Sequence, residues 1–397
     1  MVNTELDRIS NLPDTLVHQI LSNLDITEVF QNIILSKIWK SLCTSLPFLN
    51  FNYSTFFTFK LKNKHISRYN MDQVNDVNQF CHEEFIDVVN KVIIFHDNNV
   101  SNIQTIHLSG SFGYANTTWL LVAVLGNLQQ LDLHLICREC NFKLPQCLVT
   151  CKSLVILKLE IELVESFCRD DRDFVCVNLP KLVNLPKLKT LHFRSFCFDG
   201  GCQFIQKFLL GCPVLDTLSI IKCGFHQTSS ISMSPTQVKH LEIDEIYGCQ
   251  GCCGNYTTFP KFEVTMFAPM LITLKIKGYI SDKYLAVNLS SLVKADIDME
   301  SKKHGEESDT DSESDGDTDS VVDSDAESED DSGPYRIPNK DSDTAAVKEV
   351  GVNVTLLLAS GCNAKSLMVS TSLLEYILRN SCNLEQLHVE IVRVRTI

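Results

Sequence analysis

The sequence predicts a mixed α/β protein in which a short helical unit precedes an irregular stack of strand repeats. Two observations predict this class. Apolar residues recur at helical spacing within residues 7–50, and from residue 103 onward the pattern apolar-x-x-apolar-x-apolar appears again and again. An acidic segment within residues 301–350 interrupts the repeats, and we expect it to lie outside the packed fold.

The first fifty residues predict three short helices. Pro13 suits the first turn of a helix, where its missing N–H group costs nothing. Thr27 is the expected N-cap of a second helix, and Pro47 ends the third. So small a unit makes a poor independent core, and its apolar side should pack on a partner or on the next domain. Both a docking module and a cap for the following repeats fit the apolar positions, which are Leu16, Ile20, Leu21 and Leu24, then Val29, Ile33 and Ile34, then Leu35, Trp39, Leu42 and Leu46.

The repeats predict short strands that stack side by side. The final apolar-x-apolar of each copy places alternate side chains on one buried face, and each unit covers that face only by contact with its neighbours. A collection of unrelated buried strands is the alternative, which so many copies disfavour. Between two copies, residues 203–210 have helical spacing, and Gly211 can end that helix. The copies begin at Ile103, Leu128, Leu154, Leu188, Leu215, Val238, Leu271, Leu292, Ala364 and Leu384.

Polar residues occupy the positions between the apolar ones and should face away from the core. For a single residue this predicts only a solvated strand face. Together, such a face is where a repeat protein usually binds a partner, and its mixed charge argues against a simple polyanion. The expected binding residues are Asp132, His134, Lys158, His192, Arg194, Glu242 and Lys275, with Glu160, Asp244 and Lys277 on the same face.

The net charge of −14 is concentrated in one segment. Residues 306–331 contain fourteen acidic residues and no Lys or Arg, which leaves 49 − 14 = 35 acidic residues against 35 basic ones elsewhere. A strongly basic nucleic-acid binder is therefore not expected. The longest apolar stretch, around residues 119–125, is too short to span a bilayer, so we expect no membrane partner. The amino terminus lacks the apolar core of a signal peptide, and we expect the seventeen cysteines to be reduced thiols in the cytosol or nucleus.

The acidic segment alternates Ser or Thr with Asp and Glu, so it is expected to be disordered and extended by charge repulsion. Six of its serines have an acidic residue three positions later, a spacing that resembles the acceptor sites of acidophilic casein-type kinases. A solubilising insertion without regulation is the simpler interpretation. The candidate phosphorylation sites are Ser308, Ser312, Ser314, Ser320, Ser324 and Ser328.

The amino-terminal unit resembles a plant F-box. The match is carried by residues 7–14 (DRISNLPD), then by Ile20-Leu21, then by Leu35-Ser36-Lys37 with Trp39. The resemblance implies a three-helix module that binds a Skp1-like adaptor and, through it, a cullin. Ile38 and Cys43 stand where family members usually carry Arg and a second Trp, a loss that would weaken packing on the repeats. The resemblance implies that the adaptor face is formed or supported by Leu12, Pro13, Leu16, Ile20, Leu21, Val29, Leu35 and Trp39.

The rest of the chain resembles plant F-box proteins with leucine-rich repeats. Residues 211–215 (GCPVL) and 185–191 (LPKLKTL) carry this resemblance, together with the stretch from Leu144-Pro145 to Leu154. The implied fold is an N-terminal three-helix F-box followed by an irregular leucine-rich-repeat solenoid, a horseshoe with a disordered acidic insert. The expected boundaries are 1–50 for the F-box, 51–102 for a connecting region and the start of the solenoid, 103–300 for the repeats, 301–350 for the insert and 351–397 for the last repeats.

The resemblance implies the substrate-recognition subunit of a Skp1–cullin–F-box ubiquitin ligase, which binds an unknown target protein and is not itself an enzyme. An interaction scaffold outside any ligase, whose helical unit only caps the solenoid, is the alternative.

Motifs for chemistry are weak, and we expect no cofactor and no metal. Cys137-x-x-Cys140, with Cys147 and Cys151, has zinc-like spacing only in its first pair. Cys249-x-x-Cys252 lies in a Gly-rich loop without an evident fourth ligand. The chain has no P-loop, no G-x-S-x-G and no H-E-x-x-H motif.

Overall fold

The computed structural model of the chain describes its helices, its strands and most of the turns between them. The described residues are 12–21, 24, 28–29, 46–63, 71–95, 103–111, 127–137, 141–163, 175–178, 180–200, 202–249, 262–279, 282–300 and 364–380.

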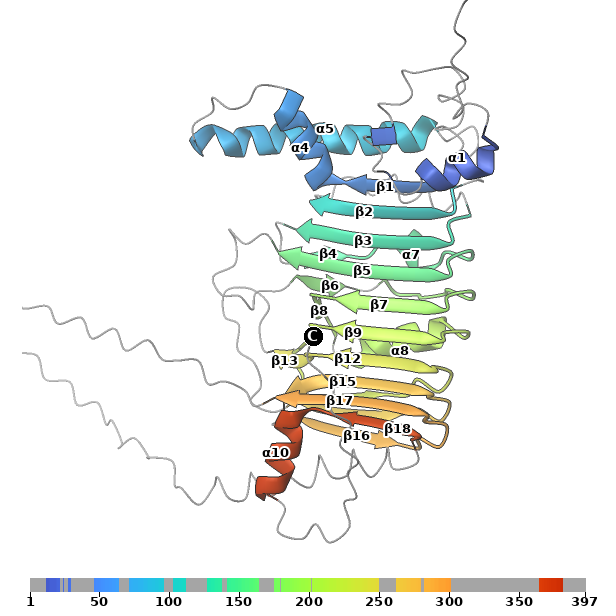
Figure 1. The fold of residues 1–397 in the computed structure, drawn as a ribbon, viewed down its shortest axis with the longest axis vertical. Coiled ribbons are helices and arrows are strands. Elements are labelled where there is room, and N and C mark those ends of the chain that lie inside the picture. Colours follow the sequence, from blue (N-terminus) through green and yellow to red (C-terminus); the bar gives the residue numbers. More distant parts are fainter. Residues whose placement is uncertain are drawn as a thin grey trace, which may run out of the picture.

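The largest element is a ten-stranded parallel sheet whose strands follow one another in chain order (Figure 1). The predicted mixed α/β class is therefore confirmed, and the structure adds that the strands are parallel. Every predicted strand up to Val369 lies in this sheet. Its strands are β1 (Phe48–Asn52), β2 (Thr105–Ser111), β3 (Gln130–Cys137), β5 (Ile156–Leu163), β7 (Thr190–Arg194), β9 (Thr217–Ile221), β12 (His240–Asp244), β15 (Thr273–Tyr279), β17 (Lys294–Glu300) and β18 (Ser366–Val369).

One backbone contact recurs at the start of these strands. The carbonyl of Pro47 accepts hydrogen bonds from the N–H groups of Gln104 and Thr105, at 2.7 and 3.0 Å. The carbonyl of Gln104 then accepts from Gln129 and Gln130, at 2.8 and 2.9 Å. The recurring backbone contact thus begins at Pro47, one strand before the first predicted repeat. The same paired acceptance recurs at the carbonyls of Gln129, Val155, Lys189, Asp216, Lys239 and Ile272.

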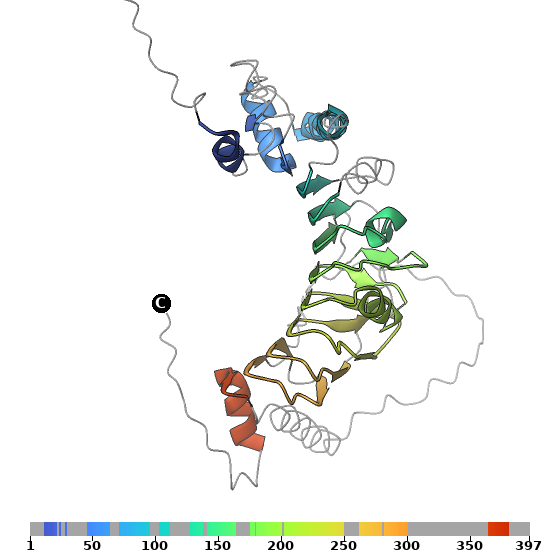
Figure 2. The same ribbon diagram turned by 90° about the vertical axis from the view of Figure 1, so that its right-hand side faces the viewer.

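Two smaller parallel sheets complete the repeats. One contains β4 (Asn141–Lys143), β6 (Cys176–Asn178), β8 (Cys197–Phe198), β10 (Gly224–His226) and β13 (Tyr247–Cys249). The other contains β11 (Ser230–Met233), β14 (Glu263–Phe267) and β16 (Lys283–Val287). In Figure 2 the stack is curved, and the ten-stranded sheet lines its concave side while α7 (Gln146–Val149) and α8 (Cys202–Gly211) lie on the convex side.

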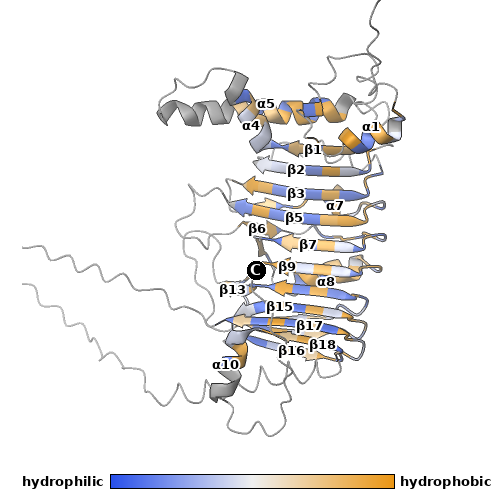
Figure 3. Ribbon diagram, viewed as in Figure 1, coloured by the Kyte–Doolittle hydropathy of each residue, from blue (hydrophilic) through white to orange (hydrophobic). Residues whose placement is uncertain are grey.

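The core is filled from both sides by alternating residues. Apolar and polar residues alternate along the strands of the large sheet (Figure 3), so that Leu131, Leu133 and Leu135 are buried while the intervening residues are not. The helix predicted at residues 203–210 is confirmed as α8, which contributes Phe204 and Phe208 to the same core.

Among the described residues, four further helices lie at the ends of the stack. At the β1 end are α1 (Asp14–Leu21), α4 (Tyr53–Asn63) and α5 (Met71–Phe95), and α10 (Thr371–Asn380) lies at the β17 end (Figure 1). Val17 and Leu21 of α1 belong to the same core as Leu49 of β1, so the amino-terminal unit and the repeats are packed together. No helix among the described residues has both the length and the apolar character needed to cross a membrane.

Several predictions fall outside the described residues. These are the second and third helices of the amino-terminal unit, the acidic insert with its six serines, and the last repeat at Leu384. The repeat after the insert is described: β18 pairs with β17, with Ser366 opposite Lys294. In that strand Leu367 is exposed, because β18 is the last strand of the sheet and no described strand covers it.

Candidate functional site

The α1 helix divides its apolar residues between two faces. Val17 and Leu21 are each only 2% exposed, whereas Leu16 and Ile20 are 46% and 52% exposed. The helix begins directly after Pro13, whose carbonyl accepts hydrogen bonds from the N–H groups of Leu16 and Val17 at 2.9 and 3.2 Å. The single stripe predicted from the sequence is thus two stripes. One packs on the core, and the other leaves two large apolar side chains in solvent.

The other residues predicted for adaptor binding take different positions. Pro13 is exposed beside Leu16, whereas Val29 is buried and Leu12 packs partly against the core. Leu35 and Trp39 lie outside the described residues. Only Pro13, Leu16 and Ile20 of the predicted set are therefore presented to solvent in the part of the chain that is described.

The second candidate site is the polar face of the ten-stranded sheet, by which we mean its side chains that point away from the core. All seven predicted target-binding residues lie on it, in two rows that cross the strands. One row follows the register His107, Asp132, Lys158, His192, Ser219, Glu242, Lys275 and Asp296. The other follows Ser109, His134, Glu160, Arg194, Ile221, Asp244, Lys277 and Asp298.

Opposite charges pair across neighbouring strands of the polar face. Lys275 Nζ lies 2.7 Å from Glu242 Oε1, and Arg194 Nε lies 3.0 Å from Glu160 Oε1. Asp132 Oδ2 lies 3.4 Å from Lys158 Nζ. Such pairs between exposed groups contribute little stability, so they order the side chains of the face more than they hold the fold together.

These contacts shift the pKa values of several groups on the polar face. Burial alone would raise the pKa of Asp132, but its hydrogen bond with His107 and the charge of that residue outweigh burial and lower it. Burial also opposes ionisation of Glu242, yet the Lys275 ammonium group lowers its pKa. Burial dominates at Asp244, where it raises the pKa, and at His192, where it lowers the pKa.

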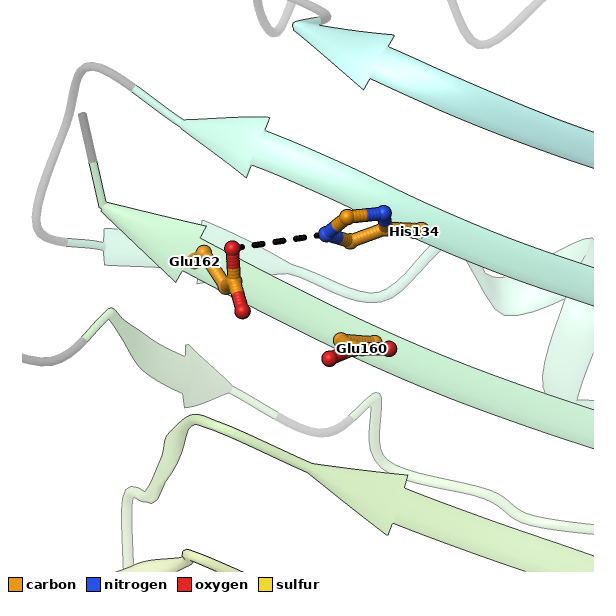
Figure 4. A group of neighbouring side chains, drawn as sticks. All are labelled: His134, Glu160 and Glu162. Atoms are coloured by element: carbon orange, nitrogen blue, oxygen red, sulfur yellow. Dashed lines mark hydrogen bonds and ion pairs between the residues drawn. The ribbon is translucent and has the colours of Figure 1, made fainter. Parts of the chain in front are cut away.

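One group on this face has the composition of a metal site. Among the described residues, His134, Glu160 and Glu162 are the only three histidine, cysteine or acidic side chains whose ligand atoms lie within 4.8 Å of one another (Figure 4). Glu162 was not among the predicted binding residues. Glu162 was missed because the repeat pattern of its strand ends at Leu159. The sequence alone does not show that β5 continues to Leu163.

The zinc-like spacing at Cys137 gives no thiol cluster in the described residues. Cys137 and Cys151 are buried free thiols, Cys147 is half-buried, and Cys140 lies outside the described residues. Cys151 Sγ instead contacts Ser153 Oγ at 3.3 Å. These thiols belong to successive turns of the core.

The second cysteine motif is built differently. Cys249 Sγ lies 3.2 Å from Cys197 Sγ, and both cluster with Cys176 in a small buried group. Cys252, its partner in the motif, lies outside the described residues. The expectation that all cysteines are reduced is wrong for Cys176, which is disulfide-bonded. The parallel strands of the five-stranded sheet bring these side chains together, which cysteine spacing along the chain does not show.

Comparison with known proteins assigns both candidate sites to known kinds of domain. Residues 9–51 match the F-box domain, and residues 117–248 match the leucine-rich repeats of the FBD-associated F-box protein At5g56370. Neither match is to an enzymatic domain. The α1 surface therefore lies in an F-box, and the central strands of the polar face lie in leucine-rich repeats.

The relatives carry the same two kinds of domain in their names. The Arabidopsis thaliana F-box/LRR-repeat protein At4g14103 is 29% identical over 299 residues, which cover 74% of this chain and 68% of that protein. The F-box/LRR-repeat protein At3g59200 of the same plant is 31% identical over 296 residues, covering 73% of this chain and 49% of that protein. Against two other F-box proteins of this plant, the chain spans 59% and 55% of their length. No solved structure matches the chain significantly.

The fold and these matches together make the chain similar to F-box proteins with leucine-rich repeats. The resemblance to plant F-box proteins with leucine-rich repeats is thereby confirmed, and the relatives found are from Arabidopsis thaliana.

Proposed function

We propose that this chain is the substrate-recognition subunit of a Skp1–cullin–F-box ubiquitin ligase. In this proposal the F-box binds a Skp1-like adaptor and, through it, a cullin. The polar face, as the concave side of a leucine-rich-repeat horseshoe, holds the target protein. The chain itself supplies no catalytic group, and it acts in the cytosol or the nucleus.

The observation that carries the proposal is the exposed apolar pair on α1. Leu16 and Ile20 lie one helical turn apart, and both are about half exposed although the same helix buries Val17 and Leu21. Leaving two large apolar side chains in solvent gains nothing for the fold, whereas covering them with a partner removes apolar area from water. Pro13 extends this surface at the start of the helix.

Adaptor binding is tested by exchanging the two exposed residues for charged ones. We expect the full chain to bind a purified Skp1-type plant adaptor in a calorimetric titration, and L16D/I20D to bind at least about tenfold more weakly. L16D/I20D should unfold at the same temperature as the unchanged protein, because neither Leu16 nor Ile20 is buried. V214D/M270D is the matched control, since these residues are 45% and 51% exposed on the repeats. This control should bind normally.

An interaction scaffold outside any ligase is the second candidate, and one observation favours it. Val17, Leu21 and Val29 share a core with Leu49 and Phe51, so the helical unit also covers the first repeat. If the unchanged protein fails to bind any adaptor while V17D unfolds the repeats, the ligase proposal is wrong and the scaffold stands.

A further inference from the structure

His134, Glu160 and Glu162 meet near the carboxyl ends of β3 and β5 on the polar face. His134 lies directly opposite Glu160 in the register of the two strands, and Glu162 is the next residue on that side of β5. In Figure 4 the imidazole ring of His134 extends toward Glu162, and Glu160 lies beside them on the same face. Their ligand atoms all lie within 4.8 Å of one another, so small side-chain movements would bring all three onto one ion.

The spacing within the group suits coordination better than direct hydrogen bonding. His134 Nε2 and Glu162 Oε2 are 3.4 Å apart, a long hydrogen bond. A charge-assisted hydrogen bond would be about 2.7–2.9 Å long. Two ligands that are each about 2.0–2.1 Å from a tetrahedral ion lie about 3.3–3.4 Å from each other. The observed separation therefore matches the edge of a coordination tetrahedron.

Ser109, on β2, fixes the orientation of the histidine ring. Its Oγ lies 3.2 Å from His134 Nδ1. With an ion on Nε2, Nδ1 carries the proton and donates it to this hydroxyl. Metal-binding histidines typically use their second nitrogen in this way, which fixes both tautomer and ring direction.

Arg194 sets the charge of the group. Its Nε lies 3.0 Å from Glu160 Oε1, so it neutralises one of the two carboxylates and leaves a net charge of about one negative unit on the pair. This is enough to attract a divalent cation but weaker than two free carboxylates would be. Arg194 therefore competes with a bound ion for the Glu160 carboxylate, so the site should respond to a substitution of Arg194 by binding the ion more tightly.

We propose that His134, Glu160 and Glu162 bind a divalent transition metal, with Zn²⁺ as the best-fitting ion, on the polar face of the repeats. One imidazole and two carboxylates are ligands that Zn²⁺ accepts. The side chains are partly exposed, with 33% of His134 and 46% of Glu162 accessible, so coordination positions remain open toward the concave side. There a bound protein could supply a further ligand. The inference does not depend on the proposed ligase function.

The test is a titration of the full chain with Zn²⁺ and with Co²⁺ as a spectroscopic probe. Free cysteines of the chain can also bind these ions, so the measured quantity is the binding that H134A removes. We expect the difference between the absorption spectra of the unchanged protein and of H134A, both with Co²⁺, to contain ligand-field bands but no thiolate-to-metal charge-transfer band. E162Q should weaken this binding about tenfold. H226A, on β10 and away from the polar face, should bind as the unchanged protein does.

Arg194 supplies the test that a merely exposed acidic surface would fail. R194Q should tighten Zn²⁺ binding several-fold, because it frees the Glu160 carboxylate. Zn²⁺ should raise the unfolding temperature of the unchanged protein and of R194Q but not that of H134A, while all three unfold alike without the ion. Equal binding by H134A and the unchanged protein, or weaker binding by R194Q, would overturn the proposal.

Discussion

The Tyr284 hydroxyl occupies the space that a side chain on Gly278 would need. A β-carbon built on Gly278 would lie 2.6 Å from the hydroxyl oxygen of Tyr284, which comes from β16 on the opposite side of the core. Tyr284 is only 2% exposed, and its hydroxyl has no hydrogen-bond partner among the described residues. Burial accordingly raises the pKa of this phenol far above its ordinary value. Because Gly278 has no side chain, the core has room for the Tyr284 hydroxyl, which forms no hydrogen bond with the described residues.

We therefore expect Tyr284→Phe to be neutral or stabilising by up to about 1 kcal/mol, because it removes a buried unpaired hydroxyl. Gly278→Ala alone should lower the free energy of unfolding by about 1–3 kcal/mol, since the methyl group clashes. In the Tyr284→Phe background the same alanine should cost less than half as much. Urea unfolding of the four proteins gives this coupling, and additive costs would show that the two residues do not compete for space.

Lys222 gives a second prediction from backbone conformation. It follows β9 with φ of 50°, in the left-handed region, and its N–H group donates to the Asp244 carbonyl at 2.8 Å. Ser195 after β7 and Glu245 after β12 have the same conformation, so this is a recurring corner of the repeats. Lys222→Asn should be neutral or slightly stabilising, whereas Lys222→Val should cost about 1–2 kcal/mol in urea unfolding.

The same pair of substitutions at Lys189 is the control for this corner. Lys189 is exposed and is not among the residues with positive φ. There valine and asparagine should differ by less than about 0.5 kcal/mol. An equal difference at both lysines would mean that the corner conformation is not what limits position 222.

Two buried thiols, those of Cys212 and Cys223, should make the stability of the protein depend on pH. Burial raises the pKa of Cys212 and of Cys223 to about 12, from an ordinary value of 9.0. Below pH 9 both folded and unfolded chains keep these protons. Above pH 9 only the unfolded chain releases them, so stability falls as the pH rises toward 12. Each thiol should contribute a loss of up to about 1.4 kcal/mol per pH unit in this window.

Urea unfolding between pH 8 and pH 10.5 measures this loss. Cys223→Ala should be less stable than the unchanged protein at pH 8, because it leaves a small cavity, but its stability should fall less steeply with pH. The folded protein should also resist thiol alkylation at these two residues. A pH slope identical in the variant would contradict the assignment to Cys223.

The large sheet could be predicted because its information is local. Each copy of the repeat, such as Leu128, Leu131 and Leu133, predicts a strand from its own residues alone. The polar residues between the apolar ones, including Asp132, lie on the polar face as predicted. What could not be predicted depends on contacts between copies. The approach of Glu162 to His134 requires the register of β3 and β5, and the meeting of Cys197 with Cys249 requires the strand order of the five-stranded sheet.

The amino-terminal region shows a different limit. Residues 48–52 (FLNFN) form β1, the first strand of the sheet, although the sequence places them at the boundary between the F-box and its connecting region. Five residues with only two buried apolar side chains, Leu49 and Phe51, are a weak signal without the neighbouring strand. The long helix α5 was likewise not predicted, because polar residues interrupt its apolar spacing.

The middle of the stack is organised around one aromatic ring. Phe193 of β7 is fully buried, and the centres of four other phenylalanine rings lie 5.1–6.0 Å from its own. Three of these contacts come from the next segments of the same repeat, through Phe198, Phe204 and Phe208. They meet Phe193 edge to face, the arrangement that aromatic rings prefer. Phe193 therefore joins β7, β8 and α8 within one repeat.

Phe193→Ala should lower the free energy of unfolding by about 3–5 kcal/mol, and Phe193→Leu by less, because leucine fills part of the space. The exposed Phe267 is the control, and Phe267→Ala should change stability by less than about 0.5 kcal/mol. Each repeat is stabilised mainly by its neighbours, so the loss should also be local. Amide hydrogen exchange in Phe193→Leu should accelerate in β5, β7 and β9 more than in β15 and β17. Uniform acceleration along the whole sheet would show instead that the repeats unfold as a single unit.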